Sequence, residues 1–282
     1  MTSDANMPQQ NAANQSLLGK HTPYCHTYDP GLLFPIPRQE KRTELGISSD
    51  SLPFSGQDVW TAYEVSWLNA KGKPLVAWAE FIFSAYSPNL IESKSFKLYL
   101  NSFNGTRFES VQAVIDSWQR DLSAASGAPV EVRLHDLSED QQLVGSMPGE
   151  CLDGLDIEIS HYQVLPSLLQ VKSSTEVAAC WHSHLLKSNC LVTGQPDWGS
   201  VLIRYEGPEI DPEGLLRYII SFREHNEFHE QCVERIFCDI MAQCAPTKLT
   251  VYARYLRRGG LDINPYRSNF EKTFNLSRLI RQ

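Results

Sequence analysis

The sequence lacks any uninterrupted apolar run of the length that crosses a membrane, so no membrane span is expected. Residues 1–20 are polar, rich in Asn and Gln, and lack the charged-then-apolar order of a signal peptide, which predicts a disordered leader. Neither a G-x-G-x-x-G fingerprint nor a phosphate-binding P-loop occurs. A nicotinamide cofactor, if the protein uses one, is therefore not held by a Rossmann domain.

Positive charge is also scarce, and the net charge of -8 argues against a general binder of nucleic acid or anionic membranes. Residues 248–282 are the exception: eight Lys or Arg against two Asp or Glu give this stretch a balance of +6, which suits a small anion. The seven cysteines are an odd number, spread from Cys25 to Cys244 without a disulfide framework. This usage indicates a reduced, cytoplasmic protein with free thiols.

The chain has 282 residues, 42% of them hydrophobic, enough for one large domain or two modest ones with a sizeable core. In the first half, residues 75–83, 95–103 and 130–134 are predicted strands, and apolar spacing predicts a helix from Val111 with Ser110 as its N-cap. The acidic, glycine-containing stretch 136–154 predicts a domain boundary near residue 145. The expected modules are therefore 21–145 and 146–282.

The second half shows a similar mixture of predicted strands and helices. Residues 155–159, 201–205 and 248–256 are predicted strands. A helix is predicted to begin at Asp211-Pro212, and a second spans the apolar positions from Val233 to Met241. Strands and helices do not alternate regularly, which favours an α+β fold with antiparallel sheets in two similar modules.

Cys190 precedes Asp197 by seven residues, and Gly194 and Pro196 between them predict a turn. Such a turn would bring the carboxylate back toward the sulfur. A thiol becomes a good nucleophile when a neighbouring group takes its proton, and Asp197 could accept that proton and return it to a substrate atom. From spacing alone, a buried cysteine beside a turn-forming Asp is the commoner arrangement.

Cys180, His182 and His184 would share one face of a strand and, with Cys190, could form a zinc site. Their order is not a common zinc spacing, and the same face could simply pack. Cys232, Cys238 and Cys244 recur every six residues and are interpreted as packing residues. The prediction is therefore of no metal, with zinc retained as the alternative.

Three further motifs could bind a ligand. A buried Glu230 could accept hydrogen bonds from a guanine-like edge, with His229 as a neighbouring donor, although both could also serve only the helix end. Ser93 and Lys94, at the entry to the predicted strand, could hold a phosphate or ribose, or form a charged strand edge. Arg258 and Gly259 would allow close approach of a phosphate.

Taken together, these segments resemble the NADPH-dependent 7-cyano-7-deazaguanine reductases, the nitrile reductases of queuosine biosynthesis, in their long two-module form. The resemblance covers nearly the whole chain after the leader, and its motifs are Ile91–Tyr99, Ser188–Asp197, Phe228–Glu230 and Arg257–Pro265.

The resemblance implies two tandem tunnelling-fold modules, with antiparallel sheets and helices on one side, in a cytoplasmic homodimer that does not touch nucleic acid directly. It implies that Cys190 forms a covalent thioimide and that Asp197 relays the proton. It also implies a substrate site formed by Ile91, Glu92, Ser93, His229 and Glu230. The implied NADPH site is formed by Ser93, Lys94, Arg258 and Gly259. Two alternatives remain: a zinc-dependent pterin or purine hydrolase of the same fold, and a purine-binding module without chemistry.

Overall fold

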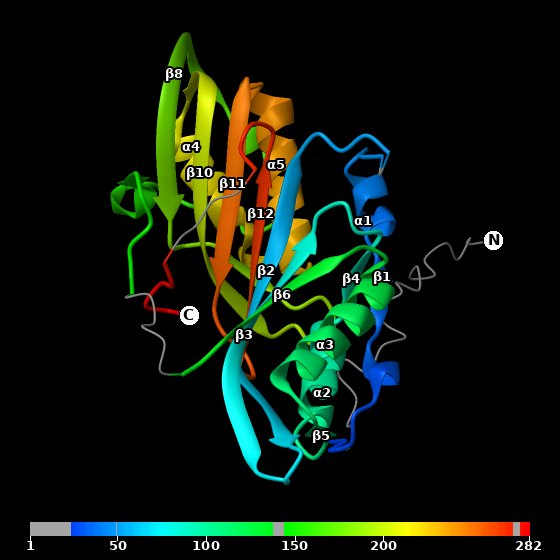
Figure 1. The fold of residues 1–282 in the computed structure, drawn as a ribbon. Helices are drawn as coiled ribbons and strands as arrows, with labels where there is room; N and C mark the ends of the chain where they lie inside the picture. Colours follow the sequence, from blue (N-terminus) through cyan, green and yellow to red (C-terminus); the bar gives the residue numbers. More distant parts are fainter. Residues whose placement is uncertain (1–23, 49, 138–143, 273–276) are drawn as a thin grey trace, which may run out of the picture.

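The computed structural model describes residues 24–48, 50–137, 144–272 and 277–282, and shows an α+β protein built on one long, mostly antiparallel sheet (Figure 1). The strand order is β6-β3-β2-β12-β11-β10-β8-β7, with β5 and β9 paired to β2 and β10. Only the β2/β5 and β7/β8 pairs of this sheet are parallel. The α+β class is confirmed. The strands are β1 (Pro35–Pro37), β2 (Ser55–Asn69), β3 (Pro74–Ser84), β4 (Asn89–Ile91), β5 (Arg107–Phe108), β6 (Val130–His135), β7 (Glu150–Cys151), β8 (Val171–Ser183), β9 (Lys187–Asn189), β10 (Pro196–Ile210), β11 (Lys248–Tyr255) and β12 (Leu261–Ser268).

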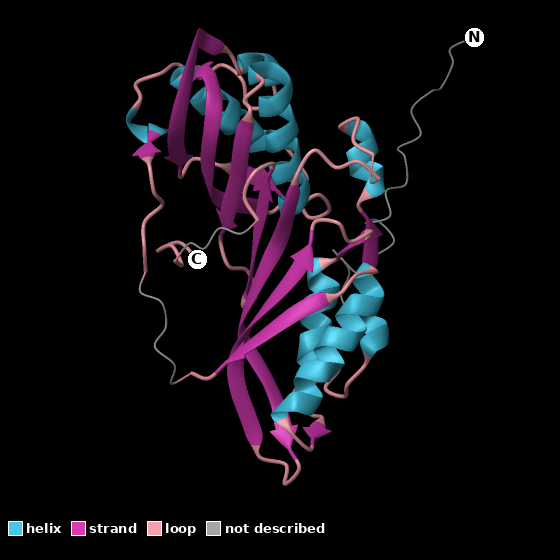
Figure 2. Ribbon diagram, turned by 45° about the horizontal axis from the view of Figure 1, so that its top comes forward, coloured by secondary structure: helices cyan, strands magenta, loops and turns pink. Residues whose placement is uncertain are grey.

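Two hydrophobic cores lie along this sheet. Helices α2 and α3 pack on β2, β3 and β6, and helices α4 and α5 pack on β10 and β11 (Figure 2). Ser110 caps α3 and Asp211 caps α4, as the sequence predicts, because each side chain accepts hydrogen bonds from backbone N–H groups of the first turn. The helices are α1 (Gln39–Glu44), α2 (Ser93–Ser102), α3 (Val111–Ser126), α4 (Pro212–Ser221) and α5 (His229–Cys244).

Two predicted strands are wrong. Residues 95–103 lie mostly in α2, where the buried side chains recur at helical spacing and Glu92 caps the first turn. The alternation of Phe96, Leu98 and Leu100 arises because two faces of this short helix are both buried. Residues 155–159 form no strand and follow a short 3₁₀ turn at Leu152–Gly154. The expected leader, residues 1–20, lies outside the described residues.

Strand β12 joins the two halves, because it lies between β2 of the first half and β11 of the second. This strand is not among those predicted from the sequence, and it contains Pro265, which has no N–H to donate. The structure accommodates this residue because β11 pairs with β12 only at residues 266–268, so the proline lies just beyond that ladder. Within the described residues, no helix has both the length and the apolar character needed to span a membrane.

A buried ion network fastens this junction. Arg267 of β12 reaches Asp58 of β2 at 2.8 Å and Glu234 of α5 at 2.9 Å. Arg42 of α1 binds the same Glu234 at 2.7 Å, and Arg38 binds Asp58 at 2.6 Å. Burial acts to raise the pKa of each carboxyl, but the neighbouring guanidinium groups outweigh it and lower the pKa of both Asp58 and Glu234.

Replacing Arg267 with Met should lower the free energy of unfolding by about 3–5 kcal/mol, because it removes a fully buried cation that contacts both Asp58 and Glu234. Denaturant titration followed by circular dichroism measures this loss. The matched control is Arg133→Met, whose ion pair with Glu131 is more than half exposed on both sides. That control should change stability by about 0–1 kcal/mol, and equal effects of the two substitutions would contradict the proposed contribution of the network.

Candidate active site

A cleft of about 420 Å³ opens where the two halves of the chain meet. Its walls come from β4 and α2 in the first half, and from the β9–β10 turn, the start of α5 and the β11–β12 connection in the second. The lining residues are Ile36, Trp60, Leu90, Ile91, Ser93, Lys94, Lys97, Cys190, Thr193, Asp197, Glu227, Phe228, His229, Glu230, Leu256, Arg258, Leu261 and Ile263. A cleft of this size with convergent polar groups is typical of a small-molecule site.

The structure brings most of the predicted site residues to this cleft and leaves two outside its lining. Glu92 is fully buried behind it, where its carboxylate oxygens accept hydrogen bonds from Lys94 N at 2.7 Å and Ser95 N at 2.8 Å. Burial nevertheless raises the pKa of Glu92. Gly259 is exposed and is not among the lining residues; it has φ +58° and lies beside the Lys97 side chain. The predicted residues that line the cleft are Ile91, Ser93, Lys94, Cys190, Asp197, His229, Glu230 and Arg258.

Cys190 and Asp197 are held by a tight hairpin between β9 and β10. Cys190 N donates to Gln195 O at 2.9 Å, and Gly194 N donates to Cys190 O at 3.0 Å. Gly194 has φ +65°, a conformation that suits glycine, and Asn189 pairs with Pro196 as the two strands meet. The predicted turn is thus present, and it places a buried thiol and a buried carboxylate on the same cleft wall.

Asp197 binds two cationic or ionisable partners. The Arg258 guanidinium makes an ion pair with one of its oxygens, and His229 Nε2 lies 3.3 Å from the other. Burial acts to raise the pKa of Asp197, but His229 and then Arg258 outweigh it, so that the pKa is lowered. Gln195 accepts a hydrogen bond from the same Arg258 at 2.7 Å, which fixes the guanidinium at the mouth of the hairpin.

His229 and Glu230 open helix α5 and face the cleft. The His229 ring stacks on Tyr255 with centroids 3.9 Å apart, and its Nδ1 is buried without a hydrogen-bond partner among the described residues. Burial, and then the charge of Asp58, raise the pKa of Glu230 to about 7. Its carboxyl therefore titrates near neutrality.

The sequence interpretation missed two charged residues of the cleft. Lys97 lies one helical turn after Ser93 on α2; burial, and then the charge of Arg258, lower its pKa. The strand prediction concealed this residue, because a strand places Lys97 on the face opposite Phe96 and Leu98, away from the core. Glu227 binds Arg235 at 2.8 Å and His225 at 2.8 Å. Burial opposes its ionisation, but these two partners lower its pKa to about 2.

The candidate zinc residues do not gather as the sequence suggests. His182 and His184 lie together with Cys151 of β7, and Cys180 is not part of this group. The cleft lining does not include Cys151, Cys180, His182 or His184. The three cysteines interpreted as packing residues lie on α5, and Cys232 and Cys244 belong to the hydrophobic core of the second half, with Cys238 partly buried against it.

Comparison with known proteins gives consistent matches. Residues 24–134 match a family described as nitrile reductase, 7-cyano-7-deazaguanine-reductase N-term, and residues 196–273 match one described as QueF-like protein. An NADPH-dependent 7-cyano-7-deazaguanine reductase of Hydrogenovibrio crunogenus is 69% identical over 96% of this chain and 98% of its own. The enzyme of the same name from Chromobacterium violaceum is 59% identical over 90% of this chain and 91% of its own. The one from Dechloromonas aromatica is 60% identical over 91% of each chain.

Among solved structures, an archaeosine synthase QueF-Like in the apo form is 17% identical, with a TM-score of 0.30. The match covers 37% of this chain and 100% of that one, and the likeness is too weak to inform the fold. The curated relatives, in contrast, align over nearly the full length of both chains. The chain therefore belongs to the family of the NADPH-dependent 7-cyano-7-deazaguanine reductases.

Proposed function

We propose that this protein reduces the nitrile of 7-cyano-7-deazaguanine to the primary amine of 7-aminomethyl-7-deazaguanine, with two NADPH, in queuosine biosynthesis. The observation that carries the proposal is a single cleft in which Cys190, Asp197 and the His229–Glu230 pair converge. The names of relatives up to 69% identical support the same reaction.

In the proposed covalent step, the Cys190 sulfur bonds to the nitrile carbon, one C–N π bond is lost, and the nitrogen gains a proton. The product is a thioimide, and the balance is met by the thiol proton, which moves from sulfur to nitrogen. Asp197 is the proposed carrier of this proton. Its lowered pKa means that it starts as a carboxylate, able to accept a proton but not to keep it, as a relay requires.

The charge of the cleft supports binding of a phosphorylated dinucleotide. Lys94, Lys97 and Arg258 are basic side chains among its lining residues, and such groups suit the pyrophosphate and 2′-phosphate of NADPH. When bound, NADPH supplies the hydrides, two of which convert a nitrile to an amine. We propose that Ser93, Lys94, Arg258 and Gly259 hold the cofactor, and that the bond to Cys190 keeps the half-reduced substrate out of water between the two additions.

The base is proposed to lie between the two halves of the chain. Glu230 would accept hydrogen bonds from the ring N–H and amino groups, His229 would contact the ring system, and Ile91 and Ser93 would line the opposite wall. Glu92, whose oxygens cap α2, would fix the helix start that carries Ser93. The proposed modules 21–145 and 146–282, each a tunnelling fold, would both contribute to the site, within a cytoplasmic homodimer.

Substrate affinity should depend on the ionisation of Glu230. Because the pKa of Glu230 is about 7, the proportion of carboxylate falls about tenfold per pH unit below 6, and the dissociation constant should rise by the same factor. Titration calorimetry with Cys190→Ala, in which binding is non-covalent, measures this between pH 5 and 8. Adding Glu230→Gln should weaken binding at pH 8 by about 10- to 100-fold and flatten the pH profile. A profile that stays steep in this double variant would show that a group other than Glu230 controls the pH dependence.

The reaction itself is tested by mixing the protein with the cyano base and NADPH. The expected result is two NADPH oxidised for each molecule of amine, followed by absorbance and product mass. Absence of NADPH oxidation, or oxidation without amine formation, would reject the proposed function.

A further inference from the structure

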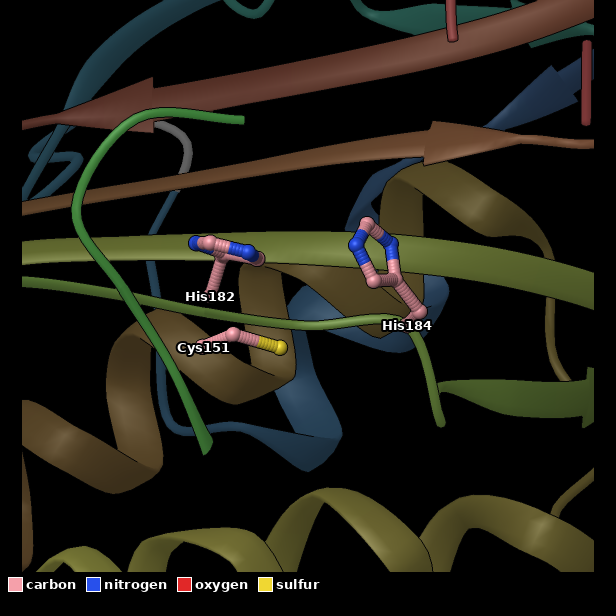
Figure 3. Close-up of side chains that lie close together, drawn as sticks. All are labelled: Cys151, His182 and His184. Atoms are coloured by element: carbon pink, nitrogen blue, oxygen red, sulfur yellow. The ribbon is translucent and has the colours of Figure 1, made fainter. Parts of the chain in front are cut away.

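Three side chains that commonly bind transition metals gather at the edge of the sheet, apart from the cleft. They are Cys151 of β7, His182 near the end of β8 and His184 just after it (Figure 3). The cysteine sulfur and one ring nitrogen of each histidine lie within 4.8 Å of one another. This cluster has no part in the proposed reduction.

The His182 ring is oriented by the backbone. Its Nδ1 lies 3.0 Å from the carbonyl oxygen of Pro148, and a carbonyl oxygen can only accept a hydrogen bond. Nδ1 must therefore carry the proton, which leaves the lone pair of the neutral ring on Nε2. A ring nitrogen held in this way by a backbone carbonyl is the usual outer contact of a metal-binding histidine.

The His184 ring is held by a hydroxyl group. Its Nδ1 lies 2.8 Å from Ser200 Oγ, which also accepts a hydrogen bond from Arg281. The hydroxyl oxygen can accept a second hydrogen bond, from the Nδ1–H of His184, so this ring too can present Nε2. The Arg281 guanidinium is itself engaged by the carbonyl oxygens of His184 and Gly199, each at 2.8 Å.

The spacing is close to that of a metal site. Bond lengths of about 2.0–2.3 Å in a tetrahedron place ligand atoms about 3.3–3.8 Å apart, and the three ligand atoms here lie within 4.8 Å of one another. Cys151 is exposed, so its side chain is free to rotate and bring the sulfur to bonding distance. We propose that Cys151, His182 and His184 bind a divalent transition metal ion of the zinc class, with water at the fourth position.

The metal would reinforce a connection that the protein already makes. Asp153, two residues after Cys151, accepts hydrogen bonds from Ser183 Oγ at 2.6 Å and from His184 N at 3.0 Å. β7 itself is only two residues long and pairs with β8. A bound ion would thus fasten the segment around β7 to the end of β8, seven residues before Cys190.

The test is equilibrium binding of zinc, and of cobalt as its spectroscopic probe, to the full-length protein under reducing conditions. The wild type should bind one equivalent, with a thiolate-to-cobalt charge-transfer band. Cys151→Ser and His182→Gln should each lose affinity by at least about 10- to 100-fold, because each removes a ligand outright. Cys180→Ser is the matched control, because Cys180 lies on β8, as His182 does, but is not part of the cluster. This variant should bind zinc like the wild type.

Cys190→Ala separates this site from the cleft. If it retains one equivalent and the charge-transfer band, the cluster holds the ion, whereas loss of binding in this variant would overturn the proposal. Wild-type affinity in Cys151→Ser, or no binding by the wild type, would also overturn it. Thermal unfolding of apo and zinc-loaded protein provides a second readout: zinc should raise the melting temperature of the wild type and not that of Cys151→Ser.

Discussion

Cys190→Ala is expected to abolish both the covalent adduct and turnover. Without NADPH, the wild type incubated with the cyano base should gain the mass of one whole substrate molecule, because addition to the nitrile releases no fragment. The alanine variant should gain nothing. Its cleft has lost only a sulfur atom, so non-covalent binding of the base should persist, which shows that the variant is folded.

Cys25→Ala is the matched control for this experiment. Cys25 is also a free thiol but is not among the residues that line the cleft, and the protein without it should form the adduct as the wild type does. An adduct on Cys190→Ala, or normal NADPH oxidation by it, would remove the sulfur from the mechanism.

Asp197→Asn is expected to slow adduct formation by about a hundred- to ten-thousand-fold while substrate binding is retained. The amide keeps the shape of the side chain and can still accept a hydrogen bond from Arg258, but it cannot take the thiol proton. Rapid mixing with mass detection measures the rate of the covalent step separately from affinity.

Gln195→Ala distinguishes proton transfer from the placement of Arg258. Gln195 shares Arg258 with Asp197 but carries no transferable proton, so its loss should slow the covalent step by less than about tenfold. If both substitutions slow the step equally, Asp197 acts by positioning the guanidinium and not as the proton carrier.

The hairpin between β9 and β10 could be predicted from the sequence because its determinants are local. Gly194 and Pro196 specify a turn, and the turn alone decides that the chain reverses between Cys190 and Asp197. The helix caps at Ser110 and Asp211 were predictable for the same reason, since each depends on contacts within one turn.

Helix α2 was not predictable in this way, and its misassignment hid a residue of the cleft. Phe96, Leu98 and Leu100 alternate as in a strand, yet the first helical turn is fixed by Glu92, whose capping role is visible only once a helix is assumed. Lys97 was missed as a result. The stack of His229 on Tyr255 was beyond reach for another reason: it depends on how α5 lies on β11, a tertiary arrangement that no local pattern encodes.

The central position of β12 has a consequence for how the polypeptide matures on the ribosome. Tyr63 and its partner Asp262 are 199 positions apart, so one edge of β2 stays without its neighbour until residues 261–268 have been translated. During that interval the nascent chain exposes backbone groups that could pair with another nascent chain. Truncated chains that end at residue 260 should therefore accumulate as aggregates, although they contain both Cys190 and Asp197.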